Sequence, residues 1–296
     1  MRKSLIVAAV AVAAAVVPTS ASATEDGAVV LAASLRGANE VGVVGDQDGA
    51  ALQFVKVHGD QVSVAVKWRG TDRPTALHLH QGAKGTNGGV KVDFTKLLTD
   101  SKDGKSRSVT GTVEVSDPEL LNSLKTDPGS FYANLHTAEF PGGALRGQLH
   151  KVTVAAFDFH DALDNFQASV IKGKQIYECK PTADGGTAFA QRDVSALLAG
   201  RIAHSFVAPN SGTPQWIAPD GSAVTGSVIS RTPNGDGNIP ELDLKATQSG
   251  KHHGLLAGTT EILRLNTVGG VAPAGSCEPG AIVGVPYRAD YVFLQG

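Results

Sequence analysis

The sequence has no excess of basic residues. Its 296 residues include 26 lysines and arginines against 28 aspartates and glutamates, which gives a formal net charge of −2. Proteins that bind nucleic acid usually carry a strongly basic face, because the phosphate backbone has to be neutralised. The composition therefore predicts no nucleic-acid partner.

The sequence also lacks the short motifs of several enzyme classes. It contains no Gly-x-Ser-x-Gly nucleophile elbow, no His-Glu-x-x-His zinc motif and no phosphate-cradling glycine loop. A hydrolase would therefore have no recognisable nucleophile. We assign no catalytic and no cofactor-binding residues from these patterns, and an enzymatic function is not favoured.

Long apolar runs are scarce. The longest, Leu5–Val17, follows two basic residues and precedes a stretch of small residues that ends at Ala23. This order is typical of a signal peptide, here residues 1–23, which is cleaved before Thr24. No other stretch approaches the ~20 apolar residues that a membrane-spanning helix needs. We therefore expect a secreted, extracellular protein that does not span a membrane once it is processed.

Cysteine is nearly absent, since Cys179 and Cys277 are the only two. A redox-active pair is usually close in sequence, as in Cys-x-x-Cys, and these two residues are far apart. Export would place them where a disulfide persists. We predict one structural disulfide, which would stabilise the fold by roughly 4–5 kcal/mol in the chain-entropy account.

Glycine and proline are plentiful and evenly spread, with 35 and 14 residues, which suits many short strands joined by turns. Within residues 29–150, apolar residues alternate with others in segments such as Val62–Trp68 and Val109–Val115, the pattern of half-buried strands. One short helix is predicted after Asp117, because Pro118 suits the first helical turn and leucines follow at helical spacing. We predict an all-β domain, an antiparallel Greek-key-like sandwich with one short helix.

A second β-rich domain is expected over residues 155–296, because a chain of this length usually contains more than one domain. The join has no Ser/Pro-rich spacer, so we expect the two domains to abut. In this second domain His204, His252 and His253 are scattered and are expected to be exposed rather than to bind metal, while Trp216 is expected to pack in the core. Strand-like runs lie at residues 175–179, 223–230, 241–246, 258–265 and 287–294.

The most informative pattern is the alternation of leucine and histidine in two separated segments, 77–82 and 132–137. Successive side chains of a strand point to opposite faces, so burial of the leucines turns His78, His80 and His136 toward the other face. If the two strands are neighbours, three imidazoles converge on one outer surface. Neutral imidazole suits zinc and copper, and a metal site needs three or four donors.

Two interpretations of these histidines stay open, a zinc or copper site and ordinary solvated side chains. The candidates for a fourth ligand are His58 and His150, with Asp93 and Glu139 less favoured. The sequence alone does not say whether the two histidine-bearing strands are adjacent.

Two polar residues near the end of the first domain, Arg146 and Gln148, share a face because they lie two residues apart on a strand. A guanidinium group often ties loops together, so we expect both side chains to hydrogen-bond loop carbonyls beside the glycine-rich segments. Glu40 is open to both a structural and a functional interpretation.

Four segments of the first domain occur in the order found in a known module. They are Leu35–Val41, Ala76–Gly82, Phe131–Thr137 and Pro141–Leu149. With them the first domain resembles the CHRD domain, which is named from chordin and also occurs in secreted bacterial proteins. The resemblance implies an extracellular module and supplies no enzymatic activity.

The second domain is similar to an uncharacterised family of secreted bacterial and fungal proteins. The similarity depends on the segments Gln175–Cys179, Trp216–Ser222 and Arg264–Gly270, followed by Cys277 and Tyr287–Tyr291. It implies a compact extracellular domain and leaves the function open.

The layout of the first domain also resembles that of copper/zinc superoxide dismutase, a sandwich with strand histidines on its outer face. That resemblance implies that His78, His80 and His136 match histidine ligands and that Arg146 guides an anion. A redox role would need an open copper position.

Two hypotheses follow for the function. The first is a secreted two-domain protein without enzymatic activity, which acts on an unidentified extracellular partner or at the cell envelope. The second is a metalloprotein that holds zinc or copper on His78, His80 and His136, with superoxide chemistry as its extreme form.

Overall fold

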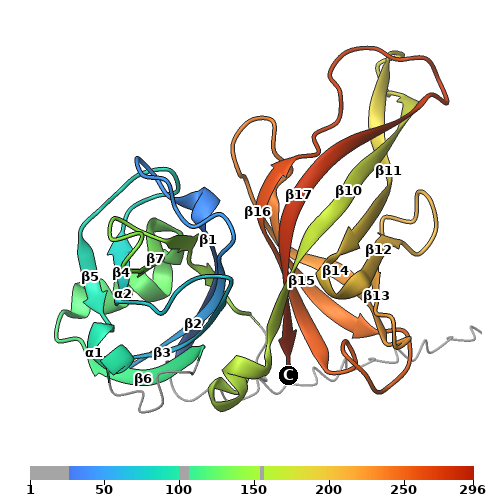
Figure 1. Ribbon diagram of the computed structural model, residues 1–296. Coiled ribbons are helices and arrows are strands. Elements are labelled where there is room, and N and C mark those ends of the chain that lie inside the picture. The colour runs from blue at the N-terminus through green and yellow to red at the C-terminus, as the bar shows by residue number, and fades with distance from the viewer. Residues whose placement is uncertain (1–26, 100–106, 154–156) are drawn as a thin grey trace, which may run out of the picture.

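The computed structural model describes residues 27–99, 107–153 and 157–296. It is mostly β, with one folded sheet followed by a closed barrel (Figure 1). The prediction of an all-β chain with two β-rich domains is confirmed. The predicted signal peptide and its cleavage site between Ala23 and Thr24 lie outside the described residues. The predicted domain limits, 29–150 and 155–296, stay predictions.

The first sheet is antiparallel throughout and has the strand order β5-β4-β7-β8-β1-β2-β3-β6, with β9 paired to β1. Its strands are β1 (Val29–Arg36), β2 (Ala50–His58), β3 (Gln61–Arg69), β4 (Ala76–Gln81), β5 (Val90–Asp93), β6 (Ser108–Glu114), β7 (Phe131–His136), β8 (Leu145–Gln148) and β9 (His150–Lys151).

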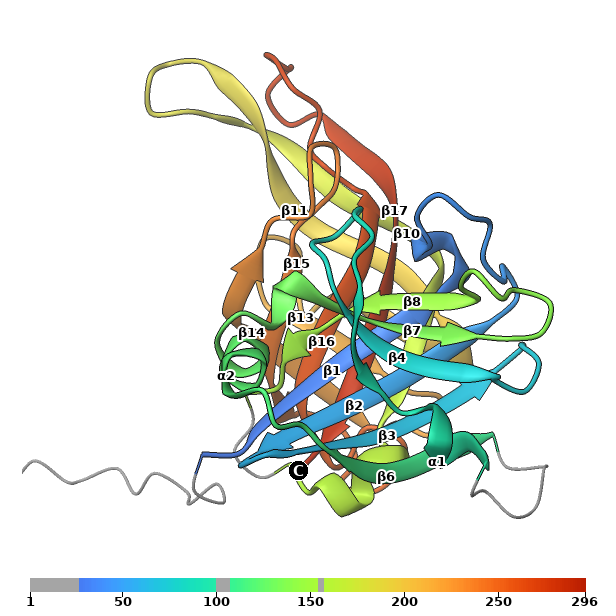
Figure 2. The same ribbon diagram turned by 90° about the vertical axis from the view of Figure 1, so that its left-hand side faces the viewer.

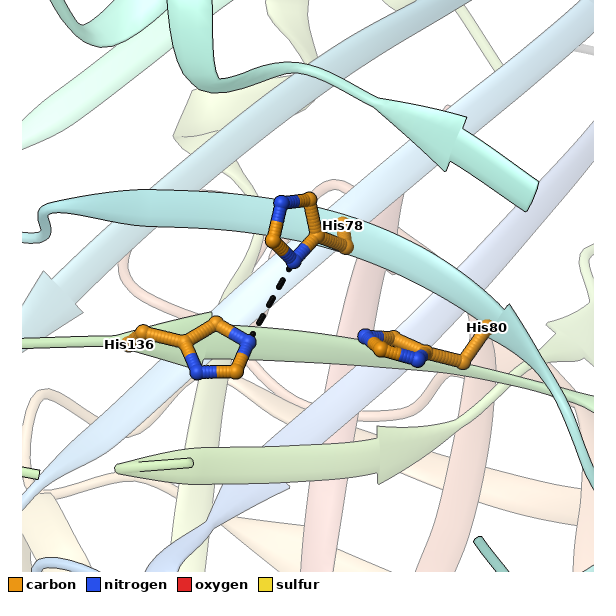
Figure 3. A group of neighbouring side chains, drawn as sticks. All are labelled: His78, His80 and His136. Carbon is orange, nitrogen blue, oxygen red and sulfur yellow. Dashed lines mark hydrogen bonds between the residues drawn. The ribbon is translucent and has the colours of Figure 1, made fainter. Parts of the chain in front are cut away.

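The sheet folds over on itself, so that β4, β7 and β8 cross in front of β1, β2 and β3 (Figure 2). The connections β3–β4, β5–β6 and β6–β7 pass between the two halves, as in a Greek key. The core between them is made of alternating residues from both halves, among them the fully buried Leu77 and Leu79 of β4. The histidines of β4 project from the opposite face of that strand (Figure 3).

The predicted helix is α2 (Pro118–Thr126). The Asp117 carboxylate accepts hydrogen bonds from the backbone N–H of Glu119 and of Leu120, which caps the first turn. The structure adds the single-turn helix α1 (Thr95–Thr99), which is too short to show a periodic pattern in the sequence. None of the helices in the described residues has the length and apolar character of a membrane span.

The barrel is a meander in which each strand pairs with the next and the last strand returns to the first. Its strands are β10 (Phe166–Pro181), β11 (Thr187–Leu198), β12 (Ile202–Phe206), β13 (Pro214–Ile217), β14 (Ala223–Thr232), β15 (Glu241–Gln248), β16 (Thr259–Gly269) and β17 (Ile282–Gln295). Four short 3₁₀ turns, η1 (Gly37–Asn39), η2 (Pro128–Ser130), η3 (Phe159–Asp164) and η4 (Ala199–Arg201), lie between strands.

The expectation that His204 is exposed is wrong. His204 is only 4% exposed, and its ring stacks on the indole of Trp216 inside the barrel. Strand alternation explains the difference, since Ile202 and His204 lie on the same buried face of β12. Trp216 is buried in the core, as predicted, whereas His252 and His253 are exposed.

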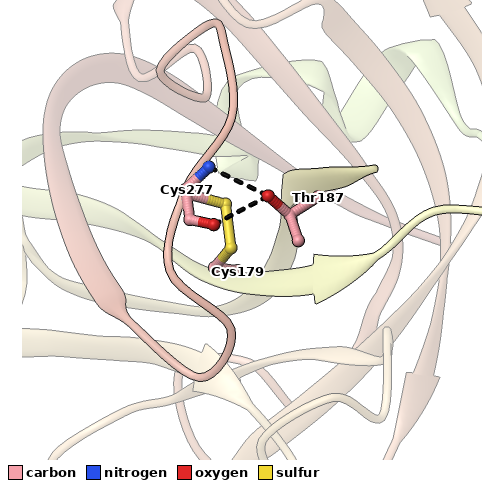
Figure 4. The surroundings of a disulfide bond; sticks show 3 residues. All are labelled: Cys179, Thr187 and Cys277. Atoms are coloured by element: carbon pink, nitrogen blue, oxygen red, sulfur yellow. Dashed lines mark hydrogen bonds between the residues drawn. A yellow bond between two sulfur atoms is a disulfide. The ribbon is translucent and has the colours of Figure 1, made fainter. Parts of the chain in front are cut away.

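The predicted disulfide between Cys179 and Cys277 is confirmed. It joins β10 to the loop that leads into β17, and the two Cα atoms lie 5.9 Å apart. The Thr187 hydroxyl accepts from the Cys277 N–H and donates to the Cys277 carbonyl, which fixes the loop against β11 (Figure 4). The disulfide therefore ties the loop before β17 to the end of β10, where the β10–β11 hairpin extends from the barrel.

The two domains abut across an apolar interface. The faces of β1 and β2 that point away from the first core pack on β16 and β17, with Phe54 of β2 and Val292 of β17 among the buried side chains. Strands β1 and β2 are thus buried on both faces, which explains why β2 has an almost uninterrupted buried pattern.

A buried carboxylate joins the domains at this interface. Asp290 of β17 forms an ion pair with Arg36 of β1 at 2.6 Å and accepts further hydrogen bonds from Ser34 and Asn266. Burial opposes ionisation of Asp290, but the hydrogen bonds and positive charge of Arg36 more than offset it and hold the pKa of the carboxyl below 3.8. The stabilisation is therefore present above that pH and is lost as the pH falls through the depressed pKa of the folded state.

We expect Asp290→Asn to lower the free energy of unfolding by about 3–5 kcal/mol, because it leaves Arg36 largely buried without its partner. Urea unfolding at neutral pH measures this loss. The matched control is Glu178→Gln, which breaks the ion pair with Arg192 at 2.8 Å on the barrel exterior. A loss as large in the control as at Asp290 would contradict the importance given to the buried pair.

Candidate metal centre

The structure brings His78, His80 and His136 together. Strands β4 and β7 are adjacent and antiparallel, with His78 opposite Asn134 and His80 opposite Tyr132. One nitrogen from each of the three imidazoles lies within 4.8 Å of the others (Figure 3). Within the described parts of the chain, these are the only three His, Cys, Asp or Glu side chains close enough together to hold a metal ion.

The separation of two of the nitrogens suits a shared ion. The distance between Nδ1 of His78 and Nε2 of His136 is 3.3 Å. Two nitrogens bound to one zinc ion at about 2.0–2.1 Å in a tetrahedral site lie roughly 3.3–3.4 Å apart. His78 and His136 therefore already have the spacing of two ligands.

Backbone carbonyls orient two of the rings. Nδ1 of His80 lies 2.9 Å from the carbonyl oxygen of Gly88, and Nδ1 of His136 lies 3.1 Å from that of Pro141. A carbonyl oxygen only accepts, so each Nδ1 carries the hydrogen and each Nε2 keeps its lone pair. Ligating histidines commonly have such a partner on the second nitrogen, because it fixes both the tautomer and the ring orientation.

The third ring is oriented by a carboxylate and a hydroxyl. Nε2 of His78 lies 3.5 Å from Oδ1 of Asp93 and 3.3 Å from Oγ1 of Thr95. Asp93 was a candidate fourth ligand, but it faces the nitrogen of His78 that points away from the other histidines. It is therefore placed to support a ligand rather than to be one.

A buried nitrogen without a partner lies in the cluster. Nε2 of His80 is inaccessible to solvent and forms no hydrogen bond. Buried polar atoms nearly always have a partner, and the other nitrogen of this ring is already committed to Gly88. A metal ion bound by the three inner nitrogens would satisfy it.

The histidines that face one another are uncharged at neutral pH. Burial lowers the pKa of His78 below 6.5, and the neighbouring His136 lowers it further. Burial also lowers the pKa of His136. Only the neutral ring offers a lone pair to a metal, so the electrostatics favour the form that binds.

The aromatic ring of Tyr132 stacks against the ring of His80. The two rings are nearly parallel, with centroids 4.9 Å apart, and the guanidinium of Arg146 lies 3.5 Å over the centre of the tyrosine ring. The tyrosine and arginine are almost fully buried although they belong to the outer face of the sheet. The loop of residues 82–89 covers them, so this face is a second, polar interior.

Arg146 and Gln148 tie that covering loop to the sheet, as predicted. Arg146 donates to the carbonyl of Thr86 at 2.6 Å, and Gln148 donates to that of Gly82 at 2.8 Å. The alternative that Arg146 guides an anion does not fit, because its guanidinium is buried and bonded to loop oxygens. Its role is to hold the loop that carries the Gly88 carbonyl.

The other candidate ligands lie elsewhere. His58 is exposed at the end of β2, and Glu139 is exposed in the loop after β7. Nε2 of His150 lies 3.5 Å from Glu241 at the domain interface. None of these residues belongs to the histidine cluster.

Little in the sequence pattern pointed to Gly88, whose carbonyl orients His80. A Cβ atom at position 88 would lie 1.6 Å from the carbonyl oxygen of Gln81, so the loop can approach the strand this closely only with glycine there. The available signal was the cluster of glycines that follows His80, which indicated a turn but not a contact.

A half-buried carboxyl lies beside the centre. Glu40 accepts a hydrogen bond at 3.3 Å from the side chain of Asn134, the cross-strand neighbour of His78. Burial raises the pKa of Glu40 to about 7, against the smaller opposing effects of Asn134 and Arg146. Gly143 has a φ of 137°, and a Cβ there would lie 2.6 Å from the carboxylate, so glycine makes room for this group.

Glu40→Gln should stabilise the metal-free protein at pH 8 and have little effect at pH 5. The folded pKa of Glu40 lies above its unfolded value, so its contribution to stability is complete below pH 4.5 and is lost as the pH rises through about 7. After discounting for partial exposure, we expect a difference of about 1–3 kcal/mol between the two pH values. Urea unfolding in the presence of a chelator measures it, with the exposed Glu139→Gln as control. A gain that does not depend on pH would contradict the assignment.

Comparison with known proteins finds one family match in each half of the chain. Residues 31–149 match the CHRD domain, and residues 198–295 match a protein family of unknown function (DUF3455). No curated protein and no solved structure shows significant similarity to the chain. Both resemblances inferred from the sequence are confirmed. The histidine cluster thus lies within the segment that matches the CHRD domain, and a segment that matches DUF3455 follows it in the chain.

Proposed function

We propose that this chain is an exported metal-binding protein that holds a zinc or copper ion on His78, His80 and His136. The observation that carries the proposal is the buried, unpaired Nε2 of His80, whose ring is oriented by the Gly88 carbonyl. Export is supported by the disulfide and by the CHRD domain, since both are typical of extracellular proteins.

The donor set selects the class of metal. Three imidazole nitrogens without a thiolate suit zinc and copper, and copper(II) binds such sites more tightly than zinc by the usual affinity order. Calcium and magnesium prefer oxygen ligands and are disfavoured. The cluster therefore favours a transition-metal ion.

Three protein ligands leave a coordination position free for water or a small ligand. The side chain of His78 is 17% exposed, so solvent reaches the edge of the cluster. The geometry gives no support to superoxide chemistry guided by Arg146, because that guanidinium is buried under the loop. We therefore favour a binding role at the cell envelope or in the extracellular space over a catalytic one.

The proposal predicts stoichiometric zinc binding by the full chain, produced without a histidine tag. His80→Gln should weaken zinc binding by more than about a hundredfold. Loss of a group that only supports a ligand already costs about 10–100-fold in affinity, and this variant removes a ligand itself. Calorimetric titration measures the affinity, and elemental analysis after dialysis measures the retained metal.

The matched control for this experiment is His58→Gln, an exposed histidine of the same domain. It should bind zinc as the wild type does. Wild-type protein that retains no zinc, or equal affinity in the His80 variant, would refute the proposed centre.

Asp93→Asn should weaken zinc binding by about tenfold, because it removes the negative charge that supports His78. Asp93 is largely exposed, so we expect the variant to fold normally. Calorimetry against Asp72→Asn, an exposed aspartate before β4, isolates the effect. Identical affinities in the two variants would show that Asp93 does not support the centre.

A further inference from the structure

The closed barrel β10–β17 contains a cavity that is separate from the histidine cluster. Every one of the eight strands contributes at least one lining residue, so the cavity lies in the barrel interior. Its volume is about 70 Å³, several times the roughly 10–15 Å³ that one water molecule requires on the same measure. Closed barrels of eight strands are wide enough to hold one small ligand.

Three buried hydrogen-bond donors that line the cavity have no partner. They are Nε1 of Trp216, Nε2 of Gln175 and Nε of Arg264. Trp216 and Gln175 are 1% exposed and Arg264 is 9% exposed. The amide of Gln175 is oriented by Gln191, which donates to its oxygen at 2.7 Å and leaves its nitrogen free. The three unpaired atoms are all donors, so the missing partner is an acceptor.

The cavity carries a net positive charge. Arg264 donates to the Pro240 carbonyl at 2.8 Å but forms no ion pair within the described residues. Arg231, an exposed residue of β14, also lines the cavity, and the described lining residues include no carboxylate. Burial lowers the pKa of His204 to about 3, so this ring stays neutral. An anionic acceptor is favoured over a neutral one.

The wall beside the donors is aromatic and apolar. Trp216 stacks on His204 with ring centroids 4.4 Å apart, and Tyr291 meets both rings edge-on. Leu242 and Leu244 line the cavity on β15. Pockets with apolar walls and a few convergent polar groups are typical of sites for small organic molecules.

We propose that the barrel binds a small organic carboxylate, with its carboxylate on Arg264, Gln175 and Trp216 and its apolar body against the aromatic wall. Three donors on three different strands match the several lone pairs of a carboxylate, and the arginine supplies its counter-charge. This site is independent of the metal centre, because its residues belong to the other domain.

Binding is testable by fluorescence, because the chain contains only two tryptophans. In a Trp68→Phe background, Trp216 is the sole reporter, and Trp68 belongs to the core of the other domain. Titration with acetate and with benzoate should give a saturable change in fluorescence. Benzyl alcohol, which has the same ring without the charge, should bind at least about tenfold more weakly than benzoate.

A pair of variants tests the counter-charge. Arg264→Gln should weaken benzoate binding by at least about tenfold. Arg288→Gln makes the same change of charge on an exposed position of β17 and should leave binding unchanged. Circular dichroism checks that each variant is folded, and the comparison of benzoate with benzyl alcohol needs no variant at all. Absence of binding by both carboxylates, or equal binding of benzoate and benzyl alcohol, would overturn the proposal.

Discussion

The register between β4 and β7 is the constraint on which the histidine cluster depends. Leu77 and Leu79 are fully buried, so the alternation of side chains leaves only one face for His78 and His80. A shift of one residue would exchange the two faces, burying imidazoles in the apolar core and exposing leucines. Burial of Leu77 and Leu79 stabilises the one register that also places His78 and His80 on the outer face.

The loop that covers the outer face of the sheet orients the histidines further. The covering loop of residues 82–89 removes Tyr132 and Arg146 from solvent, and its Gly88 carbonyl orients the ring of His80. Arg146 contacts both the tyrosine ring and the loop oxygens. The His80 ring is thus held by stacking on Tyr132 and by the hydrogen bond to the Gly88 carbonyl. Such contacts orient a ligand before the metal ion binds.

The sequence predicted what depends on local pattern. Alternation placed the histidines on one face, and the capping residue and proline placed α2, because both are properties of neighbouring residues. It did not predict the carbonyls of Gly88 and Pro141, since any residue has a carbonyl and only the folded path brings one to a ring. The burial of His204 was missed because the segment 202–206 was not predicted as a strand, so the alternation that places His204 on the same buried face as Ile202 was not applied.

The contact between the domains is directional as well as apolar. An apolar surface alone permits sliding, but the side chain of Asn39 lies between the Arg146 carbonyl and the side chain of Asn266, at 3.0 Å from each. Asn266 also donates to Asp290, which binds Arg36 of the first domain. The two interactions that cross the interface, Asn39 with Asn266 and Arg36 with Asp290, each require one relative orientation of the domains. Asn266 is also only two residues from Arg264 in the barrel cavity. Because buried polar groups lose free energy when unpaired, the network selects the orientation that satisfies all of them. This network therefore links β8, which carries Arg146, to β16, which carries Asn266 and the cavity residue Arg264.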